Sequence, residues 1–596
     1  MKRLATILAL LVAAQGWAIS ITNIASGSWT NTVIWNPAQI PTFSDTANVT
    51  GYTVTVDSLM NVGTLNHTAG TITFNAGANG STISNDWNFL GGVENGTSTN
   101  TIHEYTGTHQ CAVGRISPII LDTPGSMMVS GAYNVGVCYI LNCAYTNQFT
   151  SMYGYLTYVG LVNLNGGTLT NTGYSIVLNN NGTYTNSPLN ALPGSYWYLG
   201  ASVTIMLKSG TTYDLSRFFQ NCKTDGVGWQ SLFFQSVNTT LPLPSIVIQN
   251  VTNWMGAGIT IGLNNTLCPN VNIDSCVLAS TGNAGLNISD SPNITNPTVV
   301  VKITNSTIGN TNTYPGGSPV ASLLGSVGGT LTITNSTLRL GIQGGNTFYI
   351  GAANGNTYLT NANITAVLVN YSGAYVSPSG TFYQKNSSLT ITSLGANNPC
   401  LLKSSLSSTS DTPFDTVWIQ ANGSTPVNGL NGTWRCGTLI NSNPTATFNL
   451  FGYTLTTSTT SNYSKLIGSN STILVDQALV NVGASGVFSQ MTSTVQFGTT
   501  TNAASCNVTN FYNLLCNTPG KSVTLTNSKT VIQGTLASTG LAASNVTWTG
   551  GATLTLSNKA YLFSTSPYIR FAGKDVEVWD AAGGTNQLGT GDYWPR

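Results

Sequence analysis

Two stretches of the chain, Val301-Lys-Ile-Thr-Asn-Ser-Thr-Ile308 and Leu331-Thr-Ile-Thr-Asn-Ser-Thr-Leu338, are nearly the same eight-residue phrase. The centre of the phrase is an aliphatic residue, then a polar residue, then Asn, and this motif returns along the chain with Ser replacing Asn in some copies. The copies are Ile248-Gln-Asn250, Ile273-Asp-Ser275, Ile303-Thr-Asn305, Ile333-Thr-Asn335, Leu359-Thr-Asn361, Ile391-Thr-Ser393, Leu525-Thr-Asn527 and Leu556-Ser-Asn558. Neighbouring copies in the first run lie roughly 25 to 32 residues apart, a spacing typical of stacked repeats.

Each copy has the pattern of a short strand that ends in a tight turn, because an aliphatic residue alternates with a polar one and Asn or Ser follows. If successive coils stack in register, the aliphatic residues form an interior column and the turn residues form a hydrogen-bonded ladder. We therefore predict a structural ladder made of Asn250, Ser275, Asn305, Asn335, Asn361, Ser393, Asn527 and Asn558.

The phrase resembles the coil repeat of right-handed parallel β-helix proteins of the pectate-lyase-like class. The resemblance is strongest over about residues 245–395 and weaker over 520–562. It implies an all-β fold: a right-handed parallel β-helix, or β-solenoid, with an N-terminal cap and a small C-terminal segment. The resemblance is specific to the fold and not to one activity, and an array of β-sandwiches is the main competing architecture.

The N-terminus has the pattern of a secretory signal peptide. Met1-Lys-Arg3 precedes an apolar run from Leu4 to Ala14, and Gly16-Trp-Ala18 places small residues three and one positions before a cut. We expect residues 1–18 to be removed after Ala18, which implies an extracellular or cell-surface location. No later apolar run approaches the roughly twenty residues that a membrane span needs, so no membrane span is expected.

Three regions follow the signal. Residues 19–110 are the expected N-terminal β cap, and their opening resembles that of secreted bacterial β-solenoid proteins, in which paired tryptophans, here Trp29 and Trp35, cover the first coil. Residues 111–560 are the expected β-helix body, within which 400–520 lose the phrase and are interpreted as irregular or inserted. Residues 561–596 are the expected C-terminal cap or assembly segment.

Charge is scarce in this chain. Charged residues make up 6% of it, against about a quarter in ordinary soluble domains, and 18 basic against 17 acidic residues leave a net charge of +1. Without a Lys/Arg cluster, we expect no nucleic-acid partner. Low net charge also weakens the repulsion between copies, so the expected partner is the protein itself, as a homo-oligomer or polymer.

The last 36 residues differ, because charges of both signs are concentrated there. We interpret Asp575, Glu577, Asp580 and Trp594 as candidate assembly residues, with a plain cap as the alternative role.

Ten cysteines fit an exported protein. The close pairs Cys138 with Cys143, Cys268 with Cys276 and Cys506 with Cys516 are candidate disulfides, although Cys276 lies in the repeat phrase and could equally be a buried thiol. No C-x-x-C pair occurs and the three histidines show no ligand spacing. We expect no metal and no cofactor.

Catalysis has to be considered because the pectate-lyase-like class contains polysaccharide lyases and hydrolases, which need carboxylates or bases at a cleft. Two local groups of charged residues could form such a site if the fold brought their members together. They are Asp214, Arg217, Lys223 and Asp225, and Lys403, Asp411 and Asp415. The alternative interpretation is that these are solvated charges on loops. Motifs of polygalacturonase-like enzymes, namely Asn-Thr-Asp, Asp-Asp, Gly-His-Gly and Arg-Ile-Lys, are absent, and no His follows His109. We expect no catalytic residues.

Two functional interpretations remain. The first is an exported structural protein that forms or joins an extracellular assembly, such as a filament, sheath, surface layer or adhesive fibre, by self-association. The alternative is a secreted polysaccharide-acting or carbohydrate-binding β-helix protein that contacts cell-surface glycans. A groove lined by aromatic residues above acids would favour the alternative, and its candidate residues are Tyr155, Trp197, Tyr198, Trp229 and Trp254.

Overall fold

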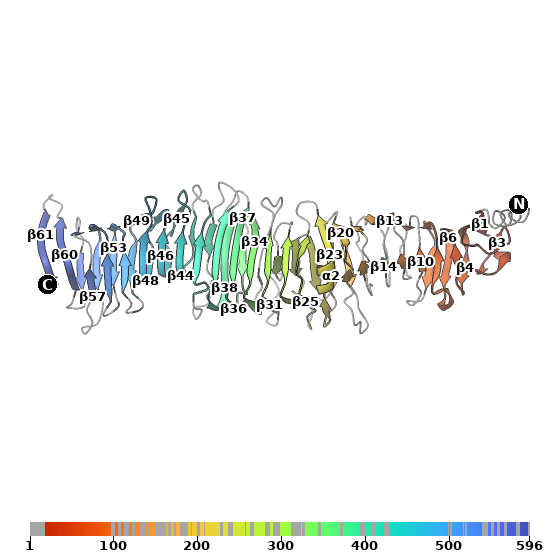
Figure 1. Cartoon of the computed structure of the whole chain (residues 1–596), viewed down its shortest axis with the longest axis horizontal. Coiled ribbons are helices and arrows are strands. Elements are labelled where there is room, and N and C mark those ends of the chain that lie inside the picture. The colour runs from red at the N-terminus through yellow and green to blue at the C-terminus, as the bar shows by residue number, and fades with distance from the viewer. Residues whose placement is uncertain are drawn as a thin grey trace, which may run out of the picture. The chain divides into compact units, whose positions relative to one another are not determined.

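The computed structural model divides the chain into two compact units, Met1–Gly282 and Asn283–Arg596, each built of stacked parallel strands (Figure 1). The structure describes residues 18–96, 102–104, 109–111, 119–121, 126–130, 138–140, 144–148, 162–164, 168–171, 175–178, 189–191, 193–199, 203–207, 209–226, 231–236, 242–256, 258–262, 268–280, 286–289, 299–310, 323–324, 328–343, 347–369, 374–393, 400–403, 405–406, 412–421, 428–498, 500, 503–516, 518, 521–538, 546–549, 553–556, 561–564, 569–579 and 585–593. Among these residues the α-helical element is the short helix α2 (Ser216–Asn221). The predicted all-β parallel β-helix is confirmed.

The first unit opens with two eleven-residue strands, β4 (Thr46–Val56) and β6 (Thr64–Phe74), which pair in parallel. Alternate residues of β4 point inward, and Val49 and Val54 are fully buried. The pairing register shifts between Val49 and Thr53, where the strands turn a corner. Gly70 adopts φ +85° at this corner, and a Cβ atom there would clash with the backbone of Tyr52, so the turn needs glycine.

The N-terminal edge of this unit is closed by short strands. β1 (Ser20–Asn23) pairs in parallel with β4, and β3 (Trp35–Asn36) pairs antiparallel with β1. Trp29 and Trp35 are each 1% exposed, their rings meet edge to face at 5.0 Å, and Trp35 Nε1 donates to the Trp29 carbonyl at 2.9 Å. The two indoles therefore cover the interior at the first coil.

The rest of the first unit consists of further stacks of parallel strands. One stack contains, in order, β5 (Asn61–Val62), β7 (Ser81–Ile83), β10 (Ile102–Glu104), β12 (Ile119–Leu121), β14 (Cys138–Ile140), β16 (Val162–Leu164) and β19 (Leu189–Ala191). A second contains β13 (Ser126–Ser130), β15 (Ala144–Gln148), β17 (Thr168–Asn171), β20 (Ser195–Leu199) and β23 (Cys222–Gly226), and a third contains β18 (Ser175–Leu178), β21 (Val203–Leu207), β24 (Ser231–Ser236) and β27 (Gly258–Gly262). The remaining strands are stacked as β22 (Thr212–Asp214), β25 (Ser245–Gln249) and β28 (Asn270–Asp274), and as β26 (Trp254–Gly256) with β29 (Val277–Ser280). The strands β8 (Trp87–Phe89) and β11 (His109–Cys111) extend the sheet of β6.

Two long parallel sheets form most of the second unit. One contains β31 (Val300–Thr304), β33 (Thr330–Thr334), β36 (Asn356–Thr360), β38 (Ala374–Lys385), β40 (Cys400–Lys403), β43 (Asn428–Asn431), β45 (Thr447–Asn449), β47 (Lys465–Ile467) and β49 (Val487–Ser489). The other begins with β32 (Thr307–Asn310), β34 (Thr337–Gln343), β37 (Asn363–Val369), β39 (Ser388–Ser393), β42 (Thr416–Ile419), β44 (Trp434–Asn441), β46 (Thr454–Asn462), β48 (Thr472–Asn481) and β50 (Thr494–Phe497).

The interior of the second unit is a set of aliphatic columns. Ile303, Ile333 and Leu359 are partners in register, and each is at most 1% exposed. Further along, Leu455, Ile473, Val495 and Leu514 form a registered interior column whose members lie closer together in the sequence. The segment 400–520, interpreted from sequence as irregular or inserted, thus continues the parallel stack with shorter coils that carry different turns.

The second unit ends with short stacked strands and an antiparallel pair. The stacked strands are β51 (Ala504–Cys506), β52 (Asn510–Phe511), β53 (Asn513–Cys516), β54 (Ser522–Leu525), β55 (Lys529–Ile532), β56 (Thr535–Ser538), β57 (Val546–Thr549), β58 (Thr553–Leu556) and β59 (Tyr561–Ser564). After them, β60 (Ile569–Trp579) pairs in parallel with β57 and β58, and β61 (Thr585–Tyr593) folds back antiparallel on β60. Within the described residues, no helix has the length and apolar character needed to cross a membrane.

Candidate functional site

Five of the eight predicted ladder residues occupy left-handed turns. The φ angles are 55° at Asn250, 55° at Ser275, 50° at Asn305, 47° at Asn335 and 48° at Asn361. Asn adopts this backbone conformation more readily than other residues with a side chain, which explains why the phrase ends in Asn.

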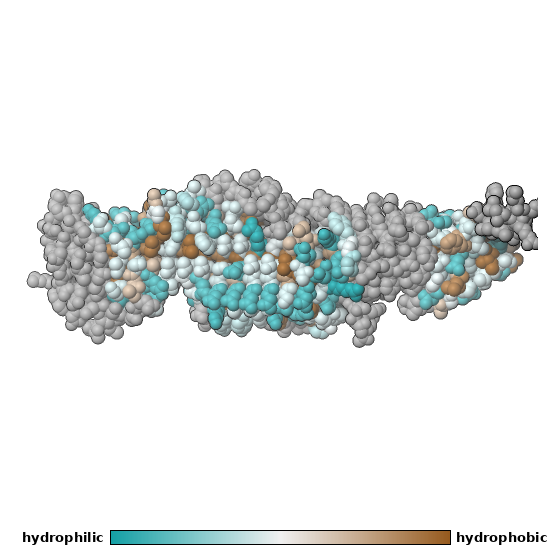
Figure 2. Space-filling model, in the orientation of Figure 1, coloured by the Kyte–Doolittle hydropathy of each residue, from teal (hydrophilic) through white to brown (hydrophobic). Residues whose placement is uncertain are grey.

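In the second unit these turns are joined through their amides. Asn335 Nδ2 donates to Asn305 Oδ1 at 3.2 Å, and Asn361 Nδ2 donates to Asn335 Oδ1 at 2.9 Å. The next member is Asn386, with φ 53°, whose Nδ2 donates to Asn361 Oδ1 at 3.3 Å. Figure 2 shows a band of hydrophilic surface over this side of β31, β36 and β38.

Ser393, which the sequence placed in this ladder, lies elsewhere. It is the last residue of β39, where it pairs with Leu368 of β37. The strand that precedes the ladder turn is the second half of β38, and its end is not marked by an Ile-Thr-Asn phrase. The signal that points to Asn386 is its distance of 25 residues from Asn361 and the Asn-Ser-Ser that begins there.

A second column of asparagines runs through the shorter coils. Asn441 Nδ2 donates to Asn462 Oδ1 at 3.0 Å and Asn462 Nδ2 to Asn481 Oδ1 at 3.1 Å, with Asn441 and Asn462 buried. Asn507 Oδ1 accepts from the Asn481 backbone N–H at 2.6 Å, and Asn527 Nδ2 donates to the Asn507 carbonyl. Asn527 therefore belongs to this column, and Asn558 lies outside the described residues.

The first unit contains a third asparagine column at its start. Asn66 Nδ2 donates to Asn48 Oδ1 at 2.9 Å, and Asn88 Nδ2 donates to Asn66 Oδ1 at 2.8 Å. Sequence analysis missed the first-unit column and all of the second column except Asn527, because the other members do not lie in copies of the repeat phrase.

The expected disulfides Cys268–Cys276 and Cys506–Cys516 are wrong for this structure, since none of these four buried cysteines is disulfide-bonded. Cys268 and Cys276 are separated by the whole of β28, and five extended residues span about 17 Å, whereas bridged Cα atoms lie within about 7 Å. The Cys138–Cys143 pair cannot be placed in the same way, because the side chain of Cys138 and all of Cys143 lie outside the described residues.

Cys506 and Cys516 occupy different interior columns. Cys506 stands in register with Leu525, and Cys516 stands in register with Phe497. Burial raises the pKa of the Cys506 thiol to about 12, despite the opposing hydrogen bond from the Val508 N–H, and burial also raises the pKa of Cys516. These cysteines act as small apolar residues of the core.

The first group of candidate catalytic charges has local roles. Asp214 is exposed, and its Oδ1 accepts hydrogen bonds from the Ser216 N–H at 3.0 Å and the Ser216 hydroxyl at 2.5 Å, which holds the turn before α2. Arg217 and Lys223 are exposed, and the side chain of Asp225 is outside the described part.

The second group behaves similarly. Asp415 Oδ1 accepts from Gln384 Nε2 at 2.7 Å, Lys403 is exposed, and Asp411 is not among the described residues. Over the described ranges, no group of three or more His, Cys, Asp or Glu side chains is placed to hold a metal ion.

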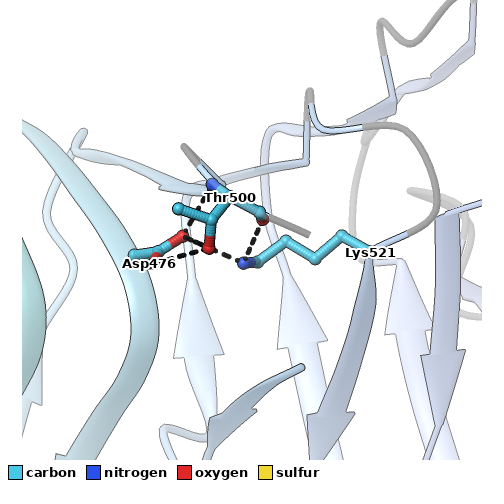
Figure 3. Close-up of polar contacts among 3 residues, drawn as sticks. All are labelled: Asp476, Thr500 and Lys521. Atoms are coloured by element: carbon cyan, nitrogen blue, oxygen red, sulfur yellow. Dashed lines mark hydrogen bonds and ion pairs between the residues drawn. The ribbon is translucent and has the colours of Figure 1, made fainter. Parts of the chain in front are cut away.

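The most buried charge cluster of the second unit is one that the sequence did not suggest, formed by Asp476, Thr500 and Lys521 (Figure 3). Lys521 is fully buried, and its Nζ lies 3.2 Å from Asp476 Oδ1 and donates to the Thr500 carbonyl at 2.9 Å. The Thr500 N–H donates to Asp476 Oδ1 at 2.9 Å and its hydroxyl donates to Oδ2 at 2.8 Å. Three segments that are well separated in the sequence are thus joined by one ion pair and its hydrogen bonds.

The first unit buries a second pair of ionisable groups. His67 Nδ1 lies 3.6 Å from Glu94 Oε1, and both side chains are inaccessible to solvent. The His67 ring stacks on Phe89 at 5.0 Å, and Trp87 Nε1 donates to Glu94 Oε1 at 3.4 Å. Both groups are thus enclosed in the core of the first unit, away from solvent.

Two of the tryptophans proposed to line a groove lie in the interior. Trp197 packs edge to face on Phe218 at 5.8 Å, and Trp254 packs on Phe219 at 5.0 Å, with both indoles at most 1% exposed. The aromatic side chains of α2 therefore join them in one core cluster. Tyr155, Trp229 and the side chain of Tyr198 lie outside the described part of the chain.

Comparison of the chain with protein-family models, with curated proteins and with solved structures finds no match.

Replacing Asn335 by Leu should lower the free energy of unfolding by about 1 to 3 kcal/mol, because two amide partners lose a hydrogen bond and Leu disfavours the left-handed turn. Asn335→Gly, which keeps the turn but removes the amide, should cost less, and Thr337→Leu at an exposed strand position should cost little. Urea denaturation measures all three. Equal tolerance of Asn335→Leu and Thr337→Leu would contradict a stabilising ladder.

Replacing Lys521 by Met should cost about 3 to 5 kcal/mol, because the Asp476 carboxylate is left buried without its counter-ion. The double variant Lys521→Met with Asp476→Asn should recover part of the loss, since Thr500 can still donate to an amide oxygen. Lys529→Met serves as the control, because Lys529 is exposed. Thermal and urea unfolding check this, and a double variant as unstable as the single one would refute the ion-pair explanation.

The native protein should resist alkylation at its described cysteines at pH 8. Burial raises the pKa of Cys400 and of Cys436 to about 12, so the reactive thiolate is scarce. Peptide mass spectrometry after alkylation should find Cys268, Cys276, Cys506 and Cys516 modified only in urea. A non-reduced peptide joining Cys268 to Cys276 would contradict this prediction.

Proposed function

We propose that this chain is an exported structural protein that forms or joins an extracellular assembly by contacts between its own copies. The sequence resemblance to the pectate-lyase-like class contributes the β-helix fold to this proposal and no enzyme activity. The observation that carries the proposal is the terminal strand β61, which in the described structure pairs along one edge, with β60.

An unpaired strand edge is a template for another chain, and the last pair of strands lacks several of the usual protections. β61 has nine residues and contains neither Lys nor Pro. Its charged residue Asp592 stands opposite Arg570 of β60 in the backbone register. In the sequence, the acidic residues Asp575, Glu577 and Asp580 follow the basic residue Lys574 closely. Complementary charges of this kind determine the register between subunits more than they increase affinity.

The sides of the coils support the same proposal. In the second unit Thr454, Thr472, Thr494 and Asn513 stand in register along the outside, and Asn513 Nδ2 donates to Thr494 Oγ1 at 3.1 Å. Figure 2 shows a described surface that mixes hydrophilic areas with scattered hydrophobic ones. Rows of uncharged hydroxyls and amides impose little electrostatic repulsion between copies.

The carbohydrate-binding alternative is less well supported. Its groove required tryptophans on the surface, and Trp197 and Trp254 are core residues. The described acids near the candidate groups are hydrogen-bonded to Ser216 and Gln384. We therefore propose self-association, and not glycan recognition, as the role of this chain.

Deleting residues 575–596 should leave a folded, exported protein that no longer assembles, because it removes β61 and the second half of β60. The triple variant Asp575→Asn, Glu577→Gln and Asp580→Asn should weaken assembly without unfolding, and added salt should weaken assembly of the natural chain. Light scattering measures the assembly of each variant, and circular dichroism measures its folding. Neutralising Asp57, Asp86 and Asp274 instead is the matched control, and normal assembly of the truncated chain would refute the proposal.

A further inference from the structure

Asp45 is a buried carboxylate at the start of the first unit, with 3% of its surface exposed. Its Oδ2 accepts from the Thr42 hydroxyl at 2.6 Å and the Thr42 N–H at 2.8 Å, while its Oδ1 accepts from the Ile19 N–H at 3.2 Å. Burial by itself raises the pKa of Asp45, but these hydrogen bonds to Thr42 and Ile19 outweigh it and hold the pKa below its usual value. The site is therefore built to keep a negative charge.

The described surroundings of this carboxylate provide no basic side chain as a counter-ion. From Ile19 to Val56 the sequence contains no charged side chain other than Asp45. Among the described residues, Lys521 forms an ion pair with Asp476, and the His67 ring lies near Glu94; neither contact involves Asp45. The hydrogen bonds from Thr42 and Ile19 satisfy part of this buried charge. A cation beside it would stabilise the carboxylate further, because a buried charge is most stable when it is paired.

The nitrogen beside Asp45 is the one that cleavage of the signal peptide would release. Ala18 is the expected last residue of the signal, and it is exposed next to Ile19. The Ile19 carbonyl accepts a hydrogen bond from the Thr46 N–H at 2.8 Å, and the next residue, Ser20, pairs with Thr46. These contacts fix the backbone of Ile19 and Ser20 beside Thr46, with the Ile19 nitrogen 3.2 Å from Asp45 Oδ1.

We propose that removal of the signal peptide completes the first unit by converting the Ile19 amide into an α-ammonium group that forms a buried ion pair with Asp45. In this step a water molecule adds its hydroxyl to the Ala18 carbonyl carbon, the Ala18–Ile19 C–N bond breaks, and the nitrogen takes the remaining proton. The free amine then binds one more proton from solvent at neutral pH. The catalyst is an endopeptidase that accepts small residues before the cut.

This ion pair makes proteolytic processing a stabilising event at the N-terminal edge. It ties the start of β1 to the segment that enters β4, where the edge is otherwise closed by the two-residue strand β3. The inference rests on cleavage after Ala18 and is independent of self-association, because its readouts are the terminus and the stability of one chain.

The first measurement is the N-terminal sequence of the exported protein, which should begin at Ile19. Two full-length mature chains are then compared, one starting at Ile19 and one carrying a single Gly before it, which displaces the ammonium by about one residue length of 3.8 Å. The chain that starts at Ile19 should unfold at the higher temperature. Asp45→Asn should abolish the difference between the two chains, and Asp57→Asn, at an exposed position, should preserve it.

The difference in unfolding temperature between the two mature chains should be present at pH 7. It should be lost well above the ordinary α-amino pKa of about 8, where the terminal amine of neither chain is charged. Asp45 is the titratable group that faces Ile19. On the neighbouring strands, Tyr52 is exposed at the far corner of β4, and His67 of β6 pairs with Glu94.

If the Asp45→Asn variant does not fold, the proposal is tested instead by chemical labelling of the terminal α-amine. The Ile19 amine should react about tenfold more slowly with an acylating reagent at pH 7 than the Gly-extended amine, a factor that corresponds to one pKa unit. An exported chain with a different first residue overturns the proposal. Equal unfolding temperatures of the two chains, or equal labelling rates, overturn it as well.

Discussion

In a stack of coils, each strand residue lies next to the residues at the same position in the preceding and following coils, about 4.8 Å away. Like charges cannot be repeated at that distance, whereas aliphatic groups, hydroxyls and amides can. Ile303, Ile333 and Leu359 illustrate the inside of this arrangement, and Asn305 and Asn335 illustrate its turns. The low charge content of the chain, 6% of its residues, fits this constraint.

Where the chain does bury charges, it pairs them across coils. Lys521 and Asp476 are far apart in the sequence and meet beside Thr500, and His67 meets Glu94 in the first unit. Such pairs add little net stability compared with apolar residues, but removal of one member is costly. Asp45 fits the same rule only if its partner is the new terminus at Ile19, which is why that site stands out from the others.

The same constraint is the reason why we propose that self-association occurs at the ends. Along the sides, uncharged rows such as Thr472 and Thr494 repeat without a distinctive feature. The N-terminal edge has a short antiparallel strand over buried indoles, while the C-terminal edge has the nine-residue strand β61. A long exposed edge strand can pair with a strand of another chain. Charges of both signs lie close to β61 in the sequence.

Much of the fold is determined locally and is readable from the sequence alone. The repeat phrase predicted stacked parallel strands, the interior column and tight turns at Asn305, Asn335 and Asn361, because each depends on a few adjacent residues. The structure shows that these turns are left-handed. Other features depend on which residues meet across coils, and therefore on coil length. The change to shorter coils created the column from Asn441 to Asn527, and Ser393 fell on the neighbouring strand.

The tertiary structure also decided the state of the cysteines and of the buried charges. Cys268 and Cys276 are close in sequence, but an extended strand keeps them apart, whereas Lys521 and Asp476 are distant in sequence and are brought together by two turns of the coil. The charged residue Asp45 was visible in the sequence from the start. Only the folded chain places it against the backbone nitrogen of Ile19, because that contact joins two strands through their register.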